Sequence, residues 1–196
     1  DAQPLKTIQE LPLIEDLPKG FMAARKGPRN WAWRGDRAAT LVYAEALDEG
    51  NPANKVDFRD EVFEWDAPFD QEARSILKTI NRFRGIIWGN DEMAIALDLW
   101  WNTRNTKAYL FNPSDLSQEP QILADRNYQD QYSNPGNFVL TKNELGRSVL
   151  AMDGDKVYLM GPGYTPEGQL PFLDEMDLKS GKKKRLYQSS YTDKME

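Results

Sequence analysis

FLDEMDLKSGKKKRLY, residues 172–187, has the pattern of two β-strands joined by a tight polar turn. Two other stretches repeat this pattern, VFEWDAPFDQEARSILK at 62–78 and AYLFNPSDLSQEPQILA at 108–124. Each contains an anchor in which an aromatic residue or methionine precedes Asp or Asn: Trp65-Asp66, Phe111-Asn112 and Met176-Asp177. A turn-forming segment then leads to a leucine 12, 12 or 10 residues after the anchor: Leu77, Leu123 and Leu186. This spacing indicates an internal repeat.

Two further strands precede each anchor. They are WAW at 31–33 with ATLVYAEA at 39–46, IIW at 86–88 with MAIALDLWW at 93–101, and FVL at 138–140 with SVLAM at 148–152. The repeats start at Trp31, Ile86 and Phe138, which are 55 and 52 residues apart. Four strands per repeat and a period near 50 residues are typical of β-propeller blades.

We therefore predict an all-β fold, a β-propeller fragment of about three four-stranded antiparallel blades at residues 29–80, 81–132 and 133–190. Residues 1–28 are predicted to contain an outer strand of a preceding blade, at 5–14, and a crossover into the first complete blade. Residues 191–196 are predicted to be a tail that leads to a next blade. Apolar positions in 69–80 also have helical spacing, but the repeat assigns this segment to an outer strand.

Local patterns support the strand assignments. In residues 93–101, Ala94 and Ala96 share one face and larger apolar residues share the other, so a neighbouring sheet can approach the alanine face closely. Pro135-Gly136 fits a type II turn. Asp153-Gly154 lies between two apolar runs, as in a tight hairpin.

The composition excludes several classes of function. The 196 residues include no histidine and no cysteine, and the net charge is −6. A Ser-His-Asp relay, a histidine-ligated metal and thiolate chemistry are therefore unavailable to this chain, and the sequence contains no Gly-x-Ser-x-Gly or phosphate-binding glycine loop. We expect no catalytic residue, metal or cofactor in the chain. We also expect no membrane span, because no apolar run is long enough, and no nucleic-acid partner, because the charge is negative.

Several stretches taken together resemble a known family. They include LPLIEDLP at 11–18, RKGPRNWAWRGDRAATLVYAEA at 25–46, LDLWWNTRNTKAYLFNP at 97–113 and GYTPEGQLPFLDEMDLKSGKKKRLYQS at 163–189. They are similar to the β-propeller of the glutamyl endopeptidase branch of the prolyl oligopeptidase family of serine peptidases, over about residues 10–190.

This resemblance implies a non-catalytic propeller segment that gates and walls the peptide-substrate cavity of a separate C-terminal α/β-hydrolase domain. That domain, which carries the family's catalytic residues, is not in this chain, so the partners implied are the hydrolase domain and a peptide substrate. The resemblance also implies a periplasmic or secreted protein, although the sequence contains no visible signal peptide.

Two arginines are candidates for substrate binding. Arg29 and Arg84 each lie two residues before the start of a repeat, at the beginning of innermost strands. Because arginine binds carboxylates through two parallel hydrogen bonds, these residues could contact the acidic side chain of a substrate. The alternative is that both form ion pairs within or between blades.

Other motifs have structural and functional interpretations. Trp31, Trp33, Trp88, Trp100 and Trp101 could stack on a ligand, but alternation favours packing between blades. The basic run GKKKR at 181–185 is interpreted as a solvated hairpin, and RGD at 34–36 as a turn between strands.

Two other functions remain open. One is a propeller scaffold for protein interactions with no enzyme attached. The other is a carboxylate-based glycosidase, for which Asp57, Glu61, Asp98 and Asp153 are candidates by residue type. Three blades are too few to close a propeller ring, which disfavours the glycosidase. Under any of these functions, an isolated three-blade segment is expected to self-associate through its exposed blade faces.

Overall fold

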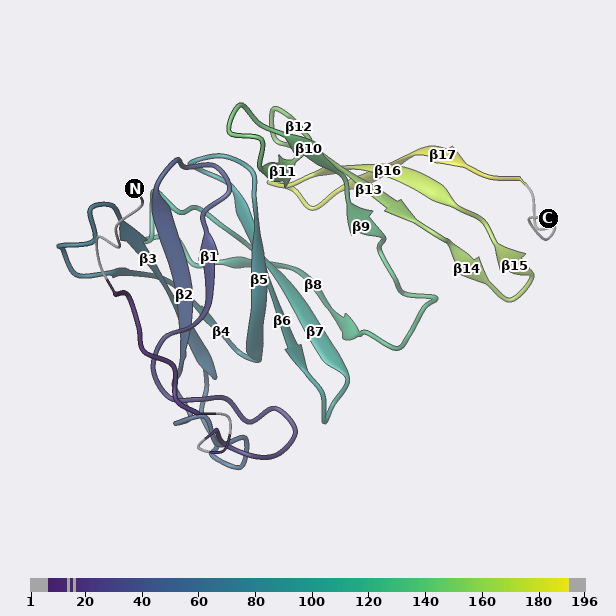
Figure 1. The fold of residues 1–196 in the computed structure, drawn as a ribbon. Coiled ribbons are helices and arrows are strands. Elements are labelled where there is room, and N and C mark those ends of the chain that lie inside the picture. The colour runs from purple at the N-terminus through teal and green to yellow at the C-terminus, as the bar shows by residue number, and fades with distance from the viewer. Residues whose placement is uncertain (1–6, 14, 16, 191–196) are drawn as a thin grey trace.

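The computed structural model describes residues 7–13, 15 and 17–190. These residues form three large antiparallel β-sheets that follow one another along the chain, with two additional two-stranded sheets in the C-terminal third (Figure 1). These residues include no α-helix. Residues 5, 6 and 14 of the predicted outer strand and the predicted tail at 191–196 lie outside the described residues. The predicted all-β propeller architecture is confirmed.

The first two sheets are four-stranded blades whose strands pair in chain order. The first consists of β1 (Arg29–Trp33), β2 (Thr40–Ala46), β3 (Asp60–Asp66) and β4 (Arg74–Thr79). The second consists of β5 (Arg82–Trp88), β6 (Ala94–Trp100), β7 (Asn105–Phe111) and β8 (Gln121–Asn127). In both blades the anchor lies at the end of the third strand, and the leucine that follows it, Leu77 or Leu123, lies in the fourth strand. Because β4 occupies residues 74–79, the strand prediction for 69–80 is correct and the helical alternative is wrong.

The third sheet has five strands and differs from the prediction. β13 (Lys156–Gly161), β16 (Phe172–Asp177) and β17 (Lys183–Gln188) form its outer part, and two short strands, β9 (Asn137–Phe138) and β12 (Met152–Asp153), both pair with the inner edge of β13. The second strand of this blade is therefore β13 and not 148–152. β14 (Tyr164–Thr165) and β15 (Gly168–Gln169) form a small hairpin between β13 and β16.

The inner strand of the third blade is interrupted by a hairpin, which is why the repeat pattern misassigned it. The chain leaves the sheet after Val139, whose N–H donates to the carbonyl of Tyr158 (2.8 Å), and returns at Ala151, whose N–H donates to the carbonyl of Val139 (2.9 Å). The excursion contains β10 (Leu140–Lys142) and β11 (Ser148–Leu150), which pair with each other. We call residues 140–150 the bridging hairpin. The predicted turn at Asp153-Gly154 then joins β12 to β13, with Gly154 at a φ of +59°.

The bridging hairpin, which belongs to the third blade, contacts the first blade directly. Arg147 Nη1 donates to the carbonyls of Arg34 (2.7 Å) and Arg37, and its Nη2 donates to that of Ala38 (3.0 Å). Asn143 Nδ2 donates to the carbonyl of Gly35 (2.9 Å). The turn between β1 and β2 is thus held by residues more than 100 positions later in the chain.

Two apolar cores lie on opposite sides of the second blade. Ala94 and Ala96 are fully buried with Val42, Val62 and other residues of the first blade, whereas Ile95 belongs to a second core with residues of the third blade. The small side chains allow close approach of the first blade, as the alternation in 93–101 predicted. Burial of these residues provides most of the stability of the stack.

The N-terminal segment forms no strand in its described part, residues 7–13, contrary to the prediction for 5–14. Pro12 has no N–H to contribute to a ladder. Gln9 instead attaches the segment to the first blade, since its Oε1 accepts hydrogen bonds from Trp31 Nε1 (2.7 Å) and Arg25 Nη2 (3.1 Å).

Candidate functional site

A cleft of about 480 Å³ lies between the inner strands β1 and β5. We call it the inner cleft. Its walls come from three parts of the chain: β1 and β2 of the first blade, β5 of the second, and the bridging hairpin of the third. The lining residues that bear on function are Asn30, Trp33, Arg84, Trp88, Arg147 and Ser148.

Matching β-bulges shape both walls of the inner cleft. In β5, Phe83 pairs with Asp98 and Gly85 with Leu97, which leaves Arg84 as the extra residue. β1 has an equivalent irregularity between Arg29 and Ala32. Because a bulge redirects the side chain of its extra residue, Arg84 projects from the regular ladder, and its side chain is solvent-exposed.

The two bulges contact each other across the cleft. Asn30, in the β1 bulge, has a φ of +57°, and its Nδ2 donates to the carbonyl of Phe83 (3.4 Å). Asparagine tolerates this left-handed conformation better than most residues. The contact fixes the position of the β5 backbone immediately before Arg84.

The inner cleft is electropositive. Its charged lining residues are Arg84 and Arg147, and no carboxylate lines it. The guanidinium of Arg147 donates its hydrogen bonds to the backbone carbonyls of residues 34, 37 and 38. These uncharged acceptors do not neutralise its positive charge. The Arg84 side chain forms no ion pair or hydrogen bond with any described residue. The cleft therefore offers one free guanidinium to an anionic group, and the half-exposed indole of Trp33 lines the same cleft.

Arg29, the other predicted substrate-binding residue, lies in a different environment. It is 8% exposed, and its guanidinium forms an ion pair with Asp60. Asp60 also binds Arg82 (3.1 Å) and accepts a hydrogen bond from the N–H of Phe83 (2.6 Å). Arg29 therefore points into a buried charge cluster rather than into the inner cleft.

Arg29 and Arg84 have comparable places in their strands but different environments. Each lies four residues before the tryptophan that ends its strand, Trp33 or Trp88. Arg29 pairs with Ala44, whereas Arg84 is the unpaired residue of its bulge. The shared position therefore did not predict that Arg29 would be buried against Asp60 while Arg84 is exposed.

The buried cluster continues beyond Asp60 and joins the first two blades. Arg82 also binds Asp48 (2.8 Å), which binds Arg59 (2.7 Å). The guanidinium of Arg59 lies 3.7 Å from the ring centroid of Trp100. A second cluster stands at the other end of the same interface, where Arg34 binds Asp36 and Glu64 and lies over Trp88 (4.4 Å). Arg34 is fully buried, so the RGD motif is a structural turn, as predicted.

The tryptophans divide between packing and exposure. Trp88 and Trp100 are buried between blades, as alternation predicted. Trp33 is 52% exposed and lines the inner cleft. Trp101 stacks on Phe21, with centroids 4.7 Å apart. Trp33 is thus the tryptophan placed to contact a ligand in the inner cleft.

The glycosidase candidates do not form an active site. Asp98 is fully buried and accepts hydrogen bonds from Asn81 N (2.9 Å), Asn81 Nδ2 (3.0 Å), Lys107 N (2.9 Å) and Tyr109 Oη (2.6 Å). Glu61 accepts a hydrogen bond from Ser75, and Asp153 lies in the third sheet. Asp98 therefore has a structural role, and Glu61, Asp98 and Asp153 belong to three different sheets.

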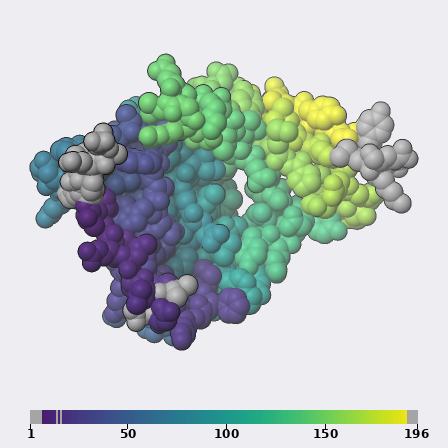
Figure 2. Space-filling model, viewed as in Figure 1, coloured from purple at the N-terminus to yellow at the C-terminus, as the bar shows by residue number. Residues whose placement is uncertain are grey.

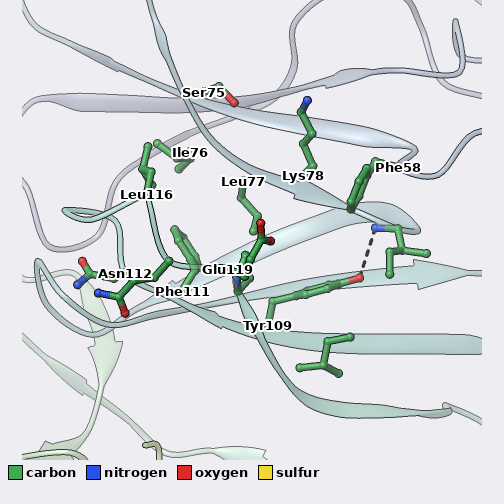
Figure 3. A pocket seen from close by; sticks show the side chains of 14 residues that line it. Phe58, Ser75, Ile76, Leu77, Lys78, Tyr109, Phe111, Asn112, Leu116 and Glu119 are labelled. Atoms are coloured by element: carbon green, nitrogen blue, oxygen red, sulfur yellow. Dashed lines mark hydrogen bonds between the residues drawn. The ribbon is translucent and has the colours of Figure 1, made fainter.

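An outer groove of about 400 Å³ lies between β4 and the outer strands of the second blade (Figure 3). Its walls are mainly apolar, with Ile76, Leu77 and Phe111 among them. Tyr109 Oη accepts a hydrogen bond from Ile80 N (3.3 Å) while donating to Asp98. Burial and the bond to Asp98 raise the pKa of Tyr109. The Tyr109 hydroxyl is thus held protonated and is unsuited to act as a base.

The described part of the chain contains no group of three or more carboxylate side chains placed to hold a metal ion. It also contains no helix with the length and apolar character needed to cross a bilayer.

Comparison with known proteins identifies relatives that are much longer than this chain. The chain is 35% identical over 196 residues to a probable chloroplastic glutamyl endopeptidase of Oryza sativa subsp. japonica, and 36% identical over 197 residues to that of Arabidopsis thaliana. The chain is similar to glutamyl endopeptidases. The matches cover 96% of this chain but only 21% and 20% of the relatives, so the chain spans about a fifth of their length. No family model matches the chain.

Solved structures show weaker likeness. TolB from Acinetobacter baumannii aligns with a TM-score of 0.41 and 16% identity, over 78% of this chain and 31% of its own. An oligogalacturonate lyase in complex with manganese aligns with a TM-score of 0.38 and 16% identity, over 87% of this chain and 38% of its own. The fold assignment above depends on the strand order of the chain itself.

Proposed function

We propose that the chain is the non-catalytic propeller segment of a glutamyl endopeptidase-like serine peptidase, and that its inner cleft forms one wall of the peptide-binding cavity. The observation that carries this proposal is the free guanidinium of Arg84, presented by a bulge in a cleft that no carboxylate lines. The similarity to glutamyl endopeptidases over 96% of the chain supports it.

The chemistry of peptide cleavage must come from elsewhere. Without histidine, the chain cannot supply the imidazole base of a serine relay. The proposed partner is an α/β-hydrolase domain that contributes nucleophile, base and acid. The propeller would limit access to that domain and hold the peptide against it, and such positioning lowers the entropic part of the barrier.

Arg84 is the residue proposed to recognise an acidic side chain. A guanidinium donates two parallel hydrogen bonds to a carboxylate, and Trp33 offers an apolar surface for the aliphatic part of the same side chain. Arg29 is less suited to this role because Asp60 already neutralises it. Arg147 would add charge to the cleft without contacting the carboxylate directly.

Replacing Arg84 with alanine tests the proposal. We expect the chain to bind a fluorescein-labelled tetrapeptide containing one glutamate more tightly than the same peptide with glutamine. Arg84→Ala should weaken binding of the glutamate peptide by about tenfold, or ~1.4 kcal/mol, and leave the glutamine peptide unaffected. Fluorescence anisotropy measures both affinities.

Arg104→Ala is the matched control for charge. Arg104 lies in the turn between β6 and β7, where it stacks on Trp101 (3.5 Å to the ring centroid), and it does not line the inner cleft. Equal losses in the two variants would show that only net charge matters. Equal affinities of the wild-type chain for the two peptides would refute recognition of the acid and favour an interaction scaffold.

Self-association of the isolated chain is also proposed. The face of the third blade turned away from the second exposes Met160 (57%) and Tyr187 (61%), and the register places both in one cross-strand row with Leu173. Apolar rows of this kind are normally covered by a neighbouring blade. We expect dimers or larger species by light scattering at high concentration, reduced by Met160→Lys; a monomer at every concentration would contradict this.

The compartment stays a prediction. The two relatives are described as chloroplastic, whereas the family resemblance led us to expect a periplasmic or secreted protein.

A further inference from the structure

A groove of about 410 Å³ separates the second and third blades. We call it the interblade groove. Figure 2 shows an opening between the teal strands of the second blade and the green segment that leads into the third. The apolar floor of the groove comes from both blades and includes Ile87, Leu97, Leu123, Leu159 and Met176. It shares no lining residue with the inner cleft.

The rim of the interblade groove is cationic. Its charged lining residues are Lys107, Arg126 and Lys183, and no carboxylate lines it. Lys107 is neutralised by an ion pair with Asp125. Arg126 Nη1 donates to the backbone carbonyls of Asn127 (3.1 Å) and Asp130 (2.9 Å) and forms no ion pair with a described residue. Hydrogen bonds from Ser133 and, to a smaller extent, the charge of Arg126 lower the pKa of the nearby Asp130 carboxyl.

Lys183 points to the groove because of its register in β17. It pairs with Met176, and directly opposed residues in antiparallel strands lie on the same face. Met176 is buried in the core shared with the second blade. The next residue, Lys184, pairs with Glu175 and therefore lies on the opposite face of the third blade.

Lys183 has no ion pair among the described residues. Asp174, on the same face, is already bound by Arg185 Nε. Lys183 remains exposed to solvent. Partial desolvation lowers its pKa, and the charge of Asp174 offsets part of that effect. Two cations from different blades, Arg126 and Lys183, thus flank an apolar floor, and neither forms an ion pair with a described residue.

We propose that the interblade groove binds an acidic peptide segment, with an aliphatic side chain on the apolar floor and carboxylates at Arg126 and Lys183. A small inorganic anion would leave the floor uncovered, whereas a peptide can satisfy the floor and both cations together. A polyanionic surface is disfavoured because the chain carries a net charge of −6. The site is independent of the proposed peptidase function.

The probe is a fluorescein-labelled hexapeptide of two leucines flanked on each side by two glutamates. We expect Lys183→Glu to weaken its binding at least tenfold, because a favourable contact becomes a repulsion, and Lys183→Met to weaken it less. Lys184→Glu is the matched control: it makes the same charge change on the same strand but on the opposite face, and should alter the affinity less than twofold.

Three results would overturn the proposal. Equal losses of affinity in Lys183→Glu and Lys184→Glu would show that only the overall charge of the chain matters. Equally tight binding of a hexaglutamate probe, which has no leucine for the apolar floor, would show the same. Absence of saturable binding by the wild-type chain would exclude the site directly. Because Lys183→Met keeps the aliphatic stem that packs on the floor, it separates loss of binding from loss of folding, which circular dichroism monitors in each variant.

Discussion

Replacing Asp60 with alanine should lower the free energy of unfolding by about 3–5 kcal/mol, the range for removing one partner of a buried ion pair. The Asp60 side chain is fully buried, and it is the shared partner of Arg29 and Arg82. It also accepts the N–H of Phe83 at 2.6 Å. The substitution would leave two guanidinium groups in a poorly solvated interface, where Asp48 is the remaining carboxylate close to Arg82.

Urea denaturation followed by tryptophan fluorescence measures this effect. Glu61→Ala is the control, because Glu61 is the next residue of β3 but lies on the opposite face, where it accepts a hydrogen bond from Ser75 (2.6 Å) and lies 3.8 Å from Lys78. A partly exposed pair of this kind contributes about 1 kcal/mol or less. If both substitutions cost the same, the Asp60 cluster is solvated and the blades are held by apolar packing alone.

The blade architecture could be predicted because it is encoded locally. Each third strand ends at an anchor such as Trp65-Asp66, and the turn that follows returns the chain as the outer strand. Alternation within a strand also predicted the packing faces, so Ala94 and Ile95 lie in different cores as expected. These signals depend on residues a few positions apart.

Inserted residues and segments limited what the pattern could predict. The bulge at Arg84 adds one residue to β5, and the irregularity in β1 adds another, so the spacing from the repeat start did not show that Arg29 pairs in its ladder while Arg84 projects from it. The bridging hairpin similarly displaced the second strand of the third blade from 148–152 to 156–161. The Asp153-Gly154 turn was the available signal, since it requires a strand on each side.

The inner cleft could be predicted only in part. Arg84 was identified from its place before an inner strand, but Arg147 was not, because its contacts join positions 113, 110 and 109 residues apart. Nothing in the local sequence around Arg147 specifies which backbone carbonyls it will meet. Trp33 was considered for ligand stacking, but its exposure depends on how the first two blades pack.

Replacing Arg147 with alanine should release the bridging hairpin from the first blade. The side chain donates to three backbone carbonyls of the turn at 34–38, and hydrogen bonds to charged groups contribute about 1.5–3 kcal/mol each. Since these bonds share one guanidinium and do not add independently, we expect a total loss of about 3 kcal/mol in urea denaturation. Arg147→Lys should recover part of the loss, because an ammonium group lacks the planar geometry that reaches all three carbonyls.

Hydrogen exchange followed by mass spectrometry locates the effect of Arg147→Ala. Protection should decrease in residues 34–38 and 140–150, whereas Lys142→Ala should leave it unchanged, because Lys142 donates only to Ser148 within the hairpin (3.0 Å). Decreased protection confined to these segments would mean that Leu150 and Met152, which pack in the second core, suffice to hold the third blade. Decreased protection that extends into β13 and β16 would mean that the hairpin sets the angle between the blades. Unchanged protection at 34–38 would contradict the role of Arg147, because those carbonyls would then not depend on it.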